Sequence, residues 1–144
     1  MVPAQQFLRS YVFFTDPTYP ETNLVVVRSR GRDGQFADVS LDCAGPLTGW
    51  TAVGGYEYTR VDLVRHDFAK QGACDNGRQH MESTAPFGVT VWGWGSKETG
   101  GIYHFPQAPG FYTQAVSYAY PAGMSVRPIN TVVVPATPKL TLPR

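Results

Sequence analysis

The chain has 144 residues, enough for one domain with a real core and too few for two domains of ordinary size. Charged residues make up only 16% of it, while Gly (15) and Pro (12) are abundant, so many short elements joined by tight turns are expected and long helices are not. A net charge of +1 with scattered Lys and Arg argues against a nucleic-acid partner. No stretch reaches the roughly 20 apolar residues of a membrane-spanning helix, so the chain is not expected to span a membrane.

Two apolar segments predict the first strands. Residues 7–15 are rich in aromatic and β-branched side chains and end at a turn containing Pro17 and Pro20. Residues 23–28 hold the continuous run Leu24 to Val27, which is typical of a central strand buried on both faces. A polar turn over 30–34 separates this strand from the next.

Alternation marks the following segments. In 36–43, Val39, Leu41 and Cys43 share one face, and 56–64 alternates in the same way. The polar segment 65–77 is expected to form a long loop. Residues 78–84 and 87–94 are predicted as two strands, broken at Ala85-Pro86 and paired as a hairpin.

The C-terminal part contains many Gly and Pro residues. A surface loop is expected over 95–110, a strand over 114–120, and a last strand over 129–134. Seven to eight short strands predict an all-β fold, an antiparallel β-sandwich of the jelly-roll or Ig-like kind. We expect one module over residues 1–134, followed by a Pro-spaced tail or linker over 135–144.

Cys43 and Cys74 could be buried thiols, half of a metal site or one disulfide, because spacing alone does not decide. We favour the disulfide, since the polar composition, rich in Gly, Pro and Tyr, suits an exported protein. The bridge would stabilise the fold by about 3 kcal/mol on the chain-entropy estimate. The chain is therefore expected to be secreted or at the cell surface, as part of a larger exported protein.

Four stretches together show a family resemblance. They are 2–7 with 11–13, Tyr19 with 23–27, His80 with 83–94, and 117–123. In order and spacing, residues 2–124 resemble the C-terminal half of the IgGFc-binding-protein N-terminal domain family. The resemblance implies a module of surface or secreted proteins.

The chain also departs from the family pattern. Trp92 and Trp94 stand where members usually carry tyrosine or another aromatic, Ala119 replaces a usual glycine, and 65–77 looks like an insertion. Antibody binding is therefore not carried over from the family name.

No chemical motif stands out. His66, His80 and His104 do not have metal-ligand spacing, so no metal or cofactor is expected. A G-x-S-x-G nucleophile elbow is absent, and although acidic residues could meet in space, none singles itself out as a catalytic pair. We therefore expect a protein that is not an enzyme.

Aromatic residues are the strongest functional indication. The candidate binding or assembly surface comprises Trp50, Trp92, Trp94, Tyr103, Phe111 and Tyr112. Trp92 and Trp94 share a face opposite Val89 and Val91, and they could either face solvent or be buried. The predicted function is a non-catalytic extracellular module for adhesion, protein–protein interaction or self-assembly, with a protein partner or identical subunits. The alternative is a carbohydrate-binding module that holds glycans on surface aromatics.

Overall fold

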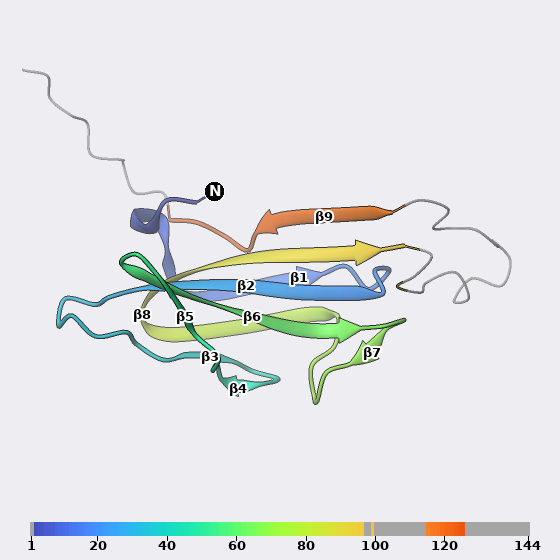
Figure 1. Ribbon diagram of the computed structural model, residues 1–144, viewed down its shortest axis with the longest axis horizontal. Helices are drawn as coiled ribbons and strands as arrows, with labels where there is room; N and C mark the ends of the chain where they lie inside the picture. The colour runs from blue at the N-terminus through green and yellow to red at the C-terminus, as the bar shows by residue number, and fades with distance from the viewer. Residues whose placement is uncertain (1, 97–98, 100–114, 126–144) are drawn as a thin grey trace, which may run out of the picture.

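The computed structural model describes residues 2–96, 99 and 115–125. The fold is all-β and antiparallel, as expected, and Figure 1 shows long strands lying side by side. One turn of 3₁₀ helix, η1 (Ala4–Gln6), precedes the strands. The strands are β1 (Leu8–Thr15), β2 (Glu21–Ser29), β3 (Val39–Leu41), β4 (Gly45–Pro46), β5 (Thr51–Val53), β6 (Tyr56–Arg65), β7 (Ala69–Lys70), β8 (Gly77–Gly95) and β9 (Val116–Pro121).

The nine strands form one curled sheet. Its hydrogen-bonded order is β4-β3-β8-β2-β6-β5, with β1 and β9 also paired to β8, and β7 paired to β6. The expected sandwich layers are thus two parts of one sheet. Among the described residues, no helix has the length and apolarity to cross a membrane.

Strand β8 joins the two layers and corrects the predicted hairpin. The two segments proposed as separate strands are one strand, which turns back at the left of Figure 1. Its first half (77–83) pairs with β1 and β3, and its second half (87–95) pairs with β2 and β9. The register pairs of the described strands leave out Thr84, Ala85 and Pro86. Pro86 is tolerated because it falls in this unpaired bend, where no ladder hydrogen bond needs its missing N–H.

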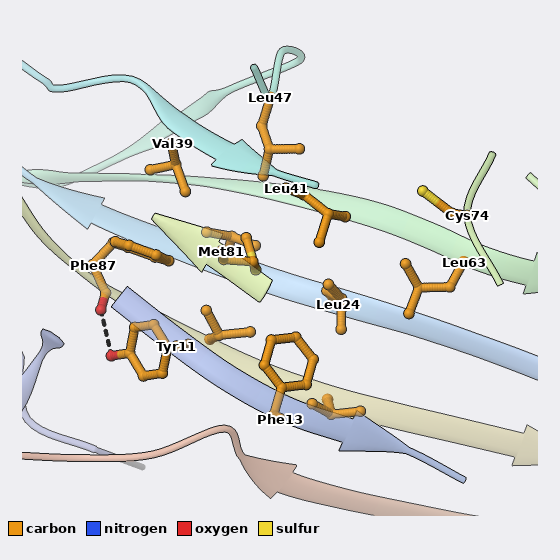
Figure 2. Packing of buried hydrophobic residues seen from close by; sticks show 13 residues of the cluster. Tyr11, Phe13, Leu24, Val39, Leu41, Leu47, Leu63, Cys74, Met81 and Phe87 are labelled. Atoms are coloured by element: carbon orange, nitrogen blue, oxygen red, sulfur yellow. Dashed lines mark hydrogen bonds between the residues drawn. The ribbon is translucent and has the colours of Figure 1, made fainter. Parts of the chain in front are cut away.

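The two layers enclose a single core. Tyr11, Phe13 and Met81 point inward from one layer, and Leu24 and Leu63 point inward from the other (Figure 2). The predicted alternation of residues 39–43 is confirmed, since Val39 and Leu41 are fully buried and Cys43 packs against the core. Every second residue of the strands in both layers therefore faces inward, and these residues form the core.

Strand β2 is central, but only one of its faces is fully buried. Leu24 and Val26 are inaccessible to solvent, whereas Val25 and Val27 are half-buried on the outer face. The prediction that this strand is buried on both faces was wrong. Its continuous apolar run instead supplies an apolar outer surface.

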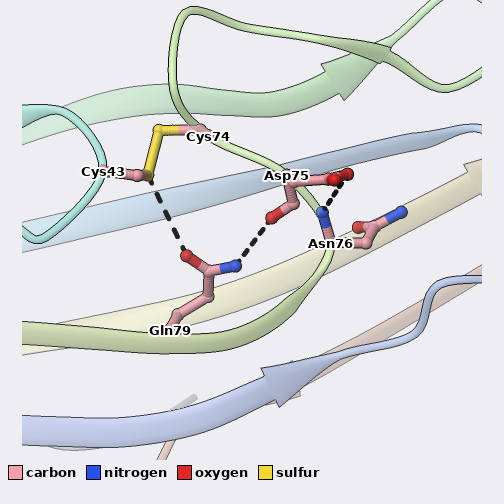
Figure 3. Close-up of a disulfide and its surroundings, with 5 residues drawn as sticks. All are labelled: Cys43, Cys74, Asp75, Asn76 and Gln79. Atoms are coloured by element: carbon pink, nitrogen blue, oxygen red, sulfur yellow. Dashed lines mark hydrogen bonds between the residues drawn. A yellow bond between two sulfur atoms is a disulfide. The ribbon is translucent and has the colours of Figure 1, made fainter.

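The predicted disulfide joins Cys43 and Cys74, whose Cα atoms are 4.9 Å apart (Figure 3). It fastens the segment after β7 to the end of β3. Gln79 lies beside it and donates a 2.7 Å hydrogen bond from Nε2 to the Asp75 carbonyl. The segment 65–77 is therefore held in place, and it contains β7 and a bridge between Gln71 and Cys74 rather than loop alone.

Strand β9 agrees with the predicted strand over 114–120, and β3 is shorter than its predicted segment. Most of the 95–110 loop, the 129–134 strand and the 135–144 tail lie outside the described residues. The domain boundaries therefore remain predictions.

Candidate functional site: an apolar groove on the outer face

An apolar groove of about 630 Å³ lies on the outer face of β5, β6, β2 and the second half of β8. We call it the outer groove. The side chains that line it are predominantly aliphatic and aromatic, among them Val2, Phe7, Val25, Val27, Val53, Tyr56, Tyr58, Thr90 and Trp92.

Strand pairing places the floor of the groove. Val27 of β2 lies between Tyr58 of β6 and Gly88 of β8, and Val25 lies beside Thr90. All of these residues point away from the core because the side chains of a strand alternate between its faces. The groove is thus the outer surface of the same strands that bury Leu24 and Val26.

The N-terminal segment forms one wall. The ring of Phe7 lies over Gly88, where a Cβ atom would overlap it. A 2.8 Å hydrogen bond from Ser125 N to Gln6 O ties this segment to the chain that follows β9. Glycine at position 88 therefore allows an aromatic ring to lie directly on the sheet.

Trp92 and Trp94 project from the outer face, and Trp94 is 40% exposed. Their rings are nearly parallel, with an interplanar angle of 6° and centroids 5.6 Å apart. Each ring therefore covers one face of the other, and the pair does not form a flat, coplanar platform.

Trp50 does not join these two tryptophans. It packs against the core, donates from Nε1 to Leu47 O at 2.9 Å, and lies 3.9 Å beneath the Arg28 guanidinium. The predicted aromatic surface is therefore divided between two places. Tyr103, Phe111 and Tyr112 lie outside the described residues, so their part in a binding surface remains a prediction.

Three groove residues on β5 and β6 were not predicted from the sequence. Val53, Tyr56 and Tyr58 are exposed by 55%, 40% and 41%. The alternation of residues 56–64 already placed Tyr56 and Tyr58 opposite the inward Thr59, which is the signal that could have identified them.

A charged border follows the aromatic part of β6. Arg60 donates from Nε to Asp62 Oδ1 at 2.9 Å, and Arg65 Nη1 lies 3.4 Å from Asp62 Oδ2. The outer surface of this strand thus changes from aromatic to charged within a few residues. Within the described part of the chain, no group of three or more His, Cys, Asp or Glu could hold a metal ion.

Comparison with known proteins identifies the family. The model of the family described as IgGFc binding protein matches residues 1–93, from the N-terminal segment into the second half of β8. No curated protein and no solved structure matches the chain. The family description points to a protein-binding module, and a disulfide is typical of extracellular proteins. Since the match covers more than half of the sequence, the chain belongs to the IgGFc-binding-protein family.

Proposed function

We propose that the chain is an extracellular or cell-surface module whose outer groove binds a protein partner or identical subunits without catalysing a reaction. Such a contact would serve adhesion or assembly into a larger structure. The observation that supports this most directly is the continuous apolar outer face made by Val25, Val27, Val53, Tyr58 and Trp92.

The energetics favour a macromolecular partner. A contiguous apolar patch with a polar border is typical of an interaction site. Burying one large apolar side chain from full exposure contributes about 1.5–3 kcal/mol. Because Val53, Tyr56 and Tyr58 are 55%, 40% and 41% exposed, covering each of them adds roughly half of that amount. Aromatic residues at the centre of a patch are also the commonest energetic anchors of protein interfaces.

The carbohydrate alternative has less support. A sugar ring stacks on an open aromatic face, but the parallel rings of Trp92 and Trp94 cover each other on one side. The groove lining offers few polar groups, chiefly the hydroxyls of Thr90, Tyr56 and Tyr58, for binding sugar hydroxyls. A protein surface suits this lining better.

Light scattering over a range of protein concentrations tests the proposal, with Trp92→Ala and Val53→Ala as groove variants. Val12→Ala is the matched control, because Val12 is a strand valine of similar exposure, 60% against 55%, on β1. A concentration-dependent mass that is lost only in the groove variants supports contact between identical subunits.

If all variants are monomeric, the same set is tested for binding to immobilised IgG Fc and to a glycan array. Binding to Fc that only the groove variants weaken supports a protein partner. Glycan binding that Trp92→Ala weakens and Val12→Ala does not would replace the proposal with the carbohydrate alternative. Equal behaviour of groove and control variants in every assay would contradict a role for the groove.

A further inference from the structure

Three polar side chains meet on the outer face of the other layer, away from the outer groove. Ser10 of β1 places its Oγ 3.3 Å from His80 Nε2 on β8. His80 Nδ1 in turn lies 3.0 Å from Oδ1 of Asp42, which follows β3. The serine, the imidazole and the carboxylate therefore form one hydrogen-bonded series.

The carboxylate fixes the direction of this series. An ionised Asp42 can only accept a hydrogen bond, so Nδ1 of a neutral His80 carries the proton and donates it. Nε2 is then the nitrogen with a free lone pair, and it accepts from the Ser10 hydroxyl. A base held in this orientation is what activation of a serine nucleophile requires.

The backbone holds the three residues in place. Asp42 N donates to His80 O at 3.1 Å, and Val12 of β1 pairs opposite His80. Asp42 also precedes Cys43, which is covalently tied to Cys74. The arrangement therefore rests on strand pairing and a disulfide.

We propose that Ser10 is an activated nucleophile that accepts an acyl group from esters with a small apolar or aromatic acyl part. Val12 and Phe14 follow Ser10 on the same face of β1 and are 60% and 61% exposed. They provide an apolar strip beside the hydroxyl on which such an acyl group can lie. This activity is independent of the groove, because Ser10, Asp42 and His80 are absent from its lining.

The reaction balances with these groups and water alone. Ser10 Oγ bonds to the ester carbonyl carbon while its proton passes to His80 Nε2. The bond to the alcohol oxygen then breaks, and His80 returns the proton to the leaving oxygen. Water attacks the acyl-serine by the same route, so that the acid is released and the Ser10 hydroxyl is restored.

Solvent limits the size of the effect. The side chain of Asp42 is 64% exposed and that of His80 is 25% exposed, so their electrostatic interaction is screened. Slow turnover is therefore expected, with acylation more readily detected than hydrolysis.

The test is labelling of the full chain by a fluorophosphonate serine probe, together with the release of p-nitrophenol from p-nitrophenyl butyrate. The label should lie on Ser10 and disappear in Ser10→Ala. His80→Gln should slow labelling by about 100-fold, the lower end of what a positioned general base contributes. Ser83→Ala is the matched control. Ser83 is a serine on β8, the strand of His80, but its hydroxyl donates to Asp38 O and not to a histidine.

Asp42 is a positioning residue, so its variants need a second readout. Asp42→Asn should slow labelling without lowering the thermal midpoint, because its amide can donate to Nδ1 and favour the tautomer with the proton on Nε2. Asp42→Glu should recover part of the rate. Labelling of Ser10→Ala or of heat-unfolded chain at the wild-type rate would overturn the proposal, as would equal rates in wild type and His80→Gln.

Discussion

The ring of Tyr118 on β9 lies over Gly93 of β8, in the space that a Cβ atom at Gly93 would occupy. The same ring stands edge-on to Tyr19 with centroids 4.6 Å apart, and its hydroxyl accepts a hydrogen bond from Asp16 N at 3.3 Å. Strand β9 is therefore fastened by an aromatic ring that requires a glycine beneath it.

Replacing Gly93 by alanine should detach β9. The added methyl group overlaps the Tyr118 ring, so the ring or the strand must move, and overpacking of this kind typically costs about 1–3 kcal/mol. Urea unfolding measures the loss. Gly55→Ala is the control, because a Cβ atom at that position meets nothing within 4 Å. Equal stability of the two variants would contradict the close packing of Tyr118 on Gly93.

Removing the disulfide should lower the free energy of unfolding. The bridge joins positions 31 residues apart, for which the chain-entropy estimate gives about 3–4 kcal/mol. Guanidinium unfolding of the Cys43→Ser, Cys74→Ser double variant provides the measurement. A reductant should destabilise the wild type and leave the double variant unchanged. If the double variant is as stable as the oxidised protein, the bridge does not constrain the fold.

Even the conservative replacement of Arg28 by lysine should destabilise the fold. Its Nη2 lies 2.8 Å from Glu57 Oε2, its Nη1 donates to Ala37 O at 2.8 Å, and its guanidinium covers Trp50. Lysine cannot make these contacts together. Arg28→Lys should lower the free energy of unfolding by about 1.5–3 kcal/mol, the range for hydrogen bonds to charged groups. It should also alter tryptophan emission.

The control for Arg28 is Arg30→Lys. Arg30 makes an exposed hydrogen bond to Gly34 O and contacts the Phe36 ring, so its replacement should have a small effect. If Arg30→Lys lowers the free energy of unfolding as much as Arg28→Lys does, the contacts of Arg28 around Trp50 are not the cause of the destabilisation.

Stability should fall in alkaline solution because of Tyr11. Burial raises the pKa of Tyr11 above its ordinary value of 10.0, an effect that the hydrogen bond from Leu8 N partly opposes. The neutral phenol is thus favoured in the folded chain. This contribution is complete below pH 10, and it is lost as the pH rises through the higher native pKa, because the unfolded chain ionises first.

Circular dichroism of urea unfolding between pH 8 and pH 11 measures this decline. Tyr11→Phe should decline less steeply above pH 10, although it is less stable at neutral pH because Phe87 O loses its donor. Val12→Ala, which removes no ionisable group, should keep the wild-type slope. An unchanged slope in Tyr11→Phe would exclude Tyr11 as the cause.

The sequence predicted the elements whose residues alternate or run continuously. Strands β1, β2 and β6 were found because apolar periodicity is set by neighbours in the chain. Strands β4, β5 and β7 have only two or three residues, too few for any periodicity. Pro86 was misinterpreted because a proline in a strand is compatible with either a break or an unpaired bend, and only the partner strands decide between them.

The candidate sites were harder to predict for the same reason. Alternation placed Trp92 and Trp94 on one face but left open whether that face is exposed. The proximity of Trp92 to Tyr58 and Phe7 depends on strand order. Ser10 and Asp42 are separated from His80 by 70 and 38 positions in the sequence. No local sequence motif reveals this cluster, because the pairing register of β1 and β3 with β8 brings the three residues together.

The path of β8 through both layers also determines how the molecule opens. Neither layer can lose its pairing with β8 without exposing the inner side of the other, because Met81 and Val91 are on one strand and in one core. Breathing motions should therefore be confined to the outermost short strands. The slowest amide protons of both layers should exchange together, at the rate set by unfolding of the whole module.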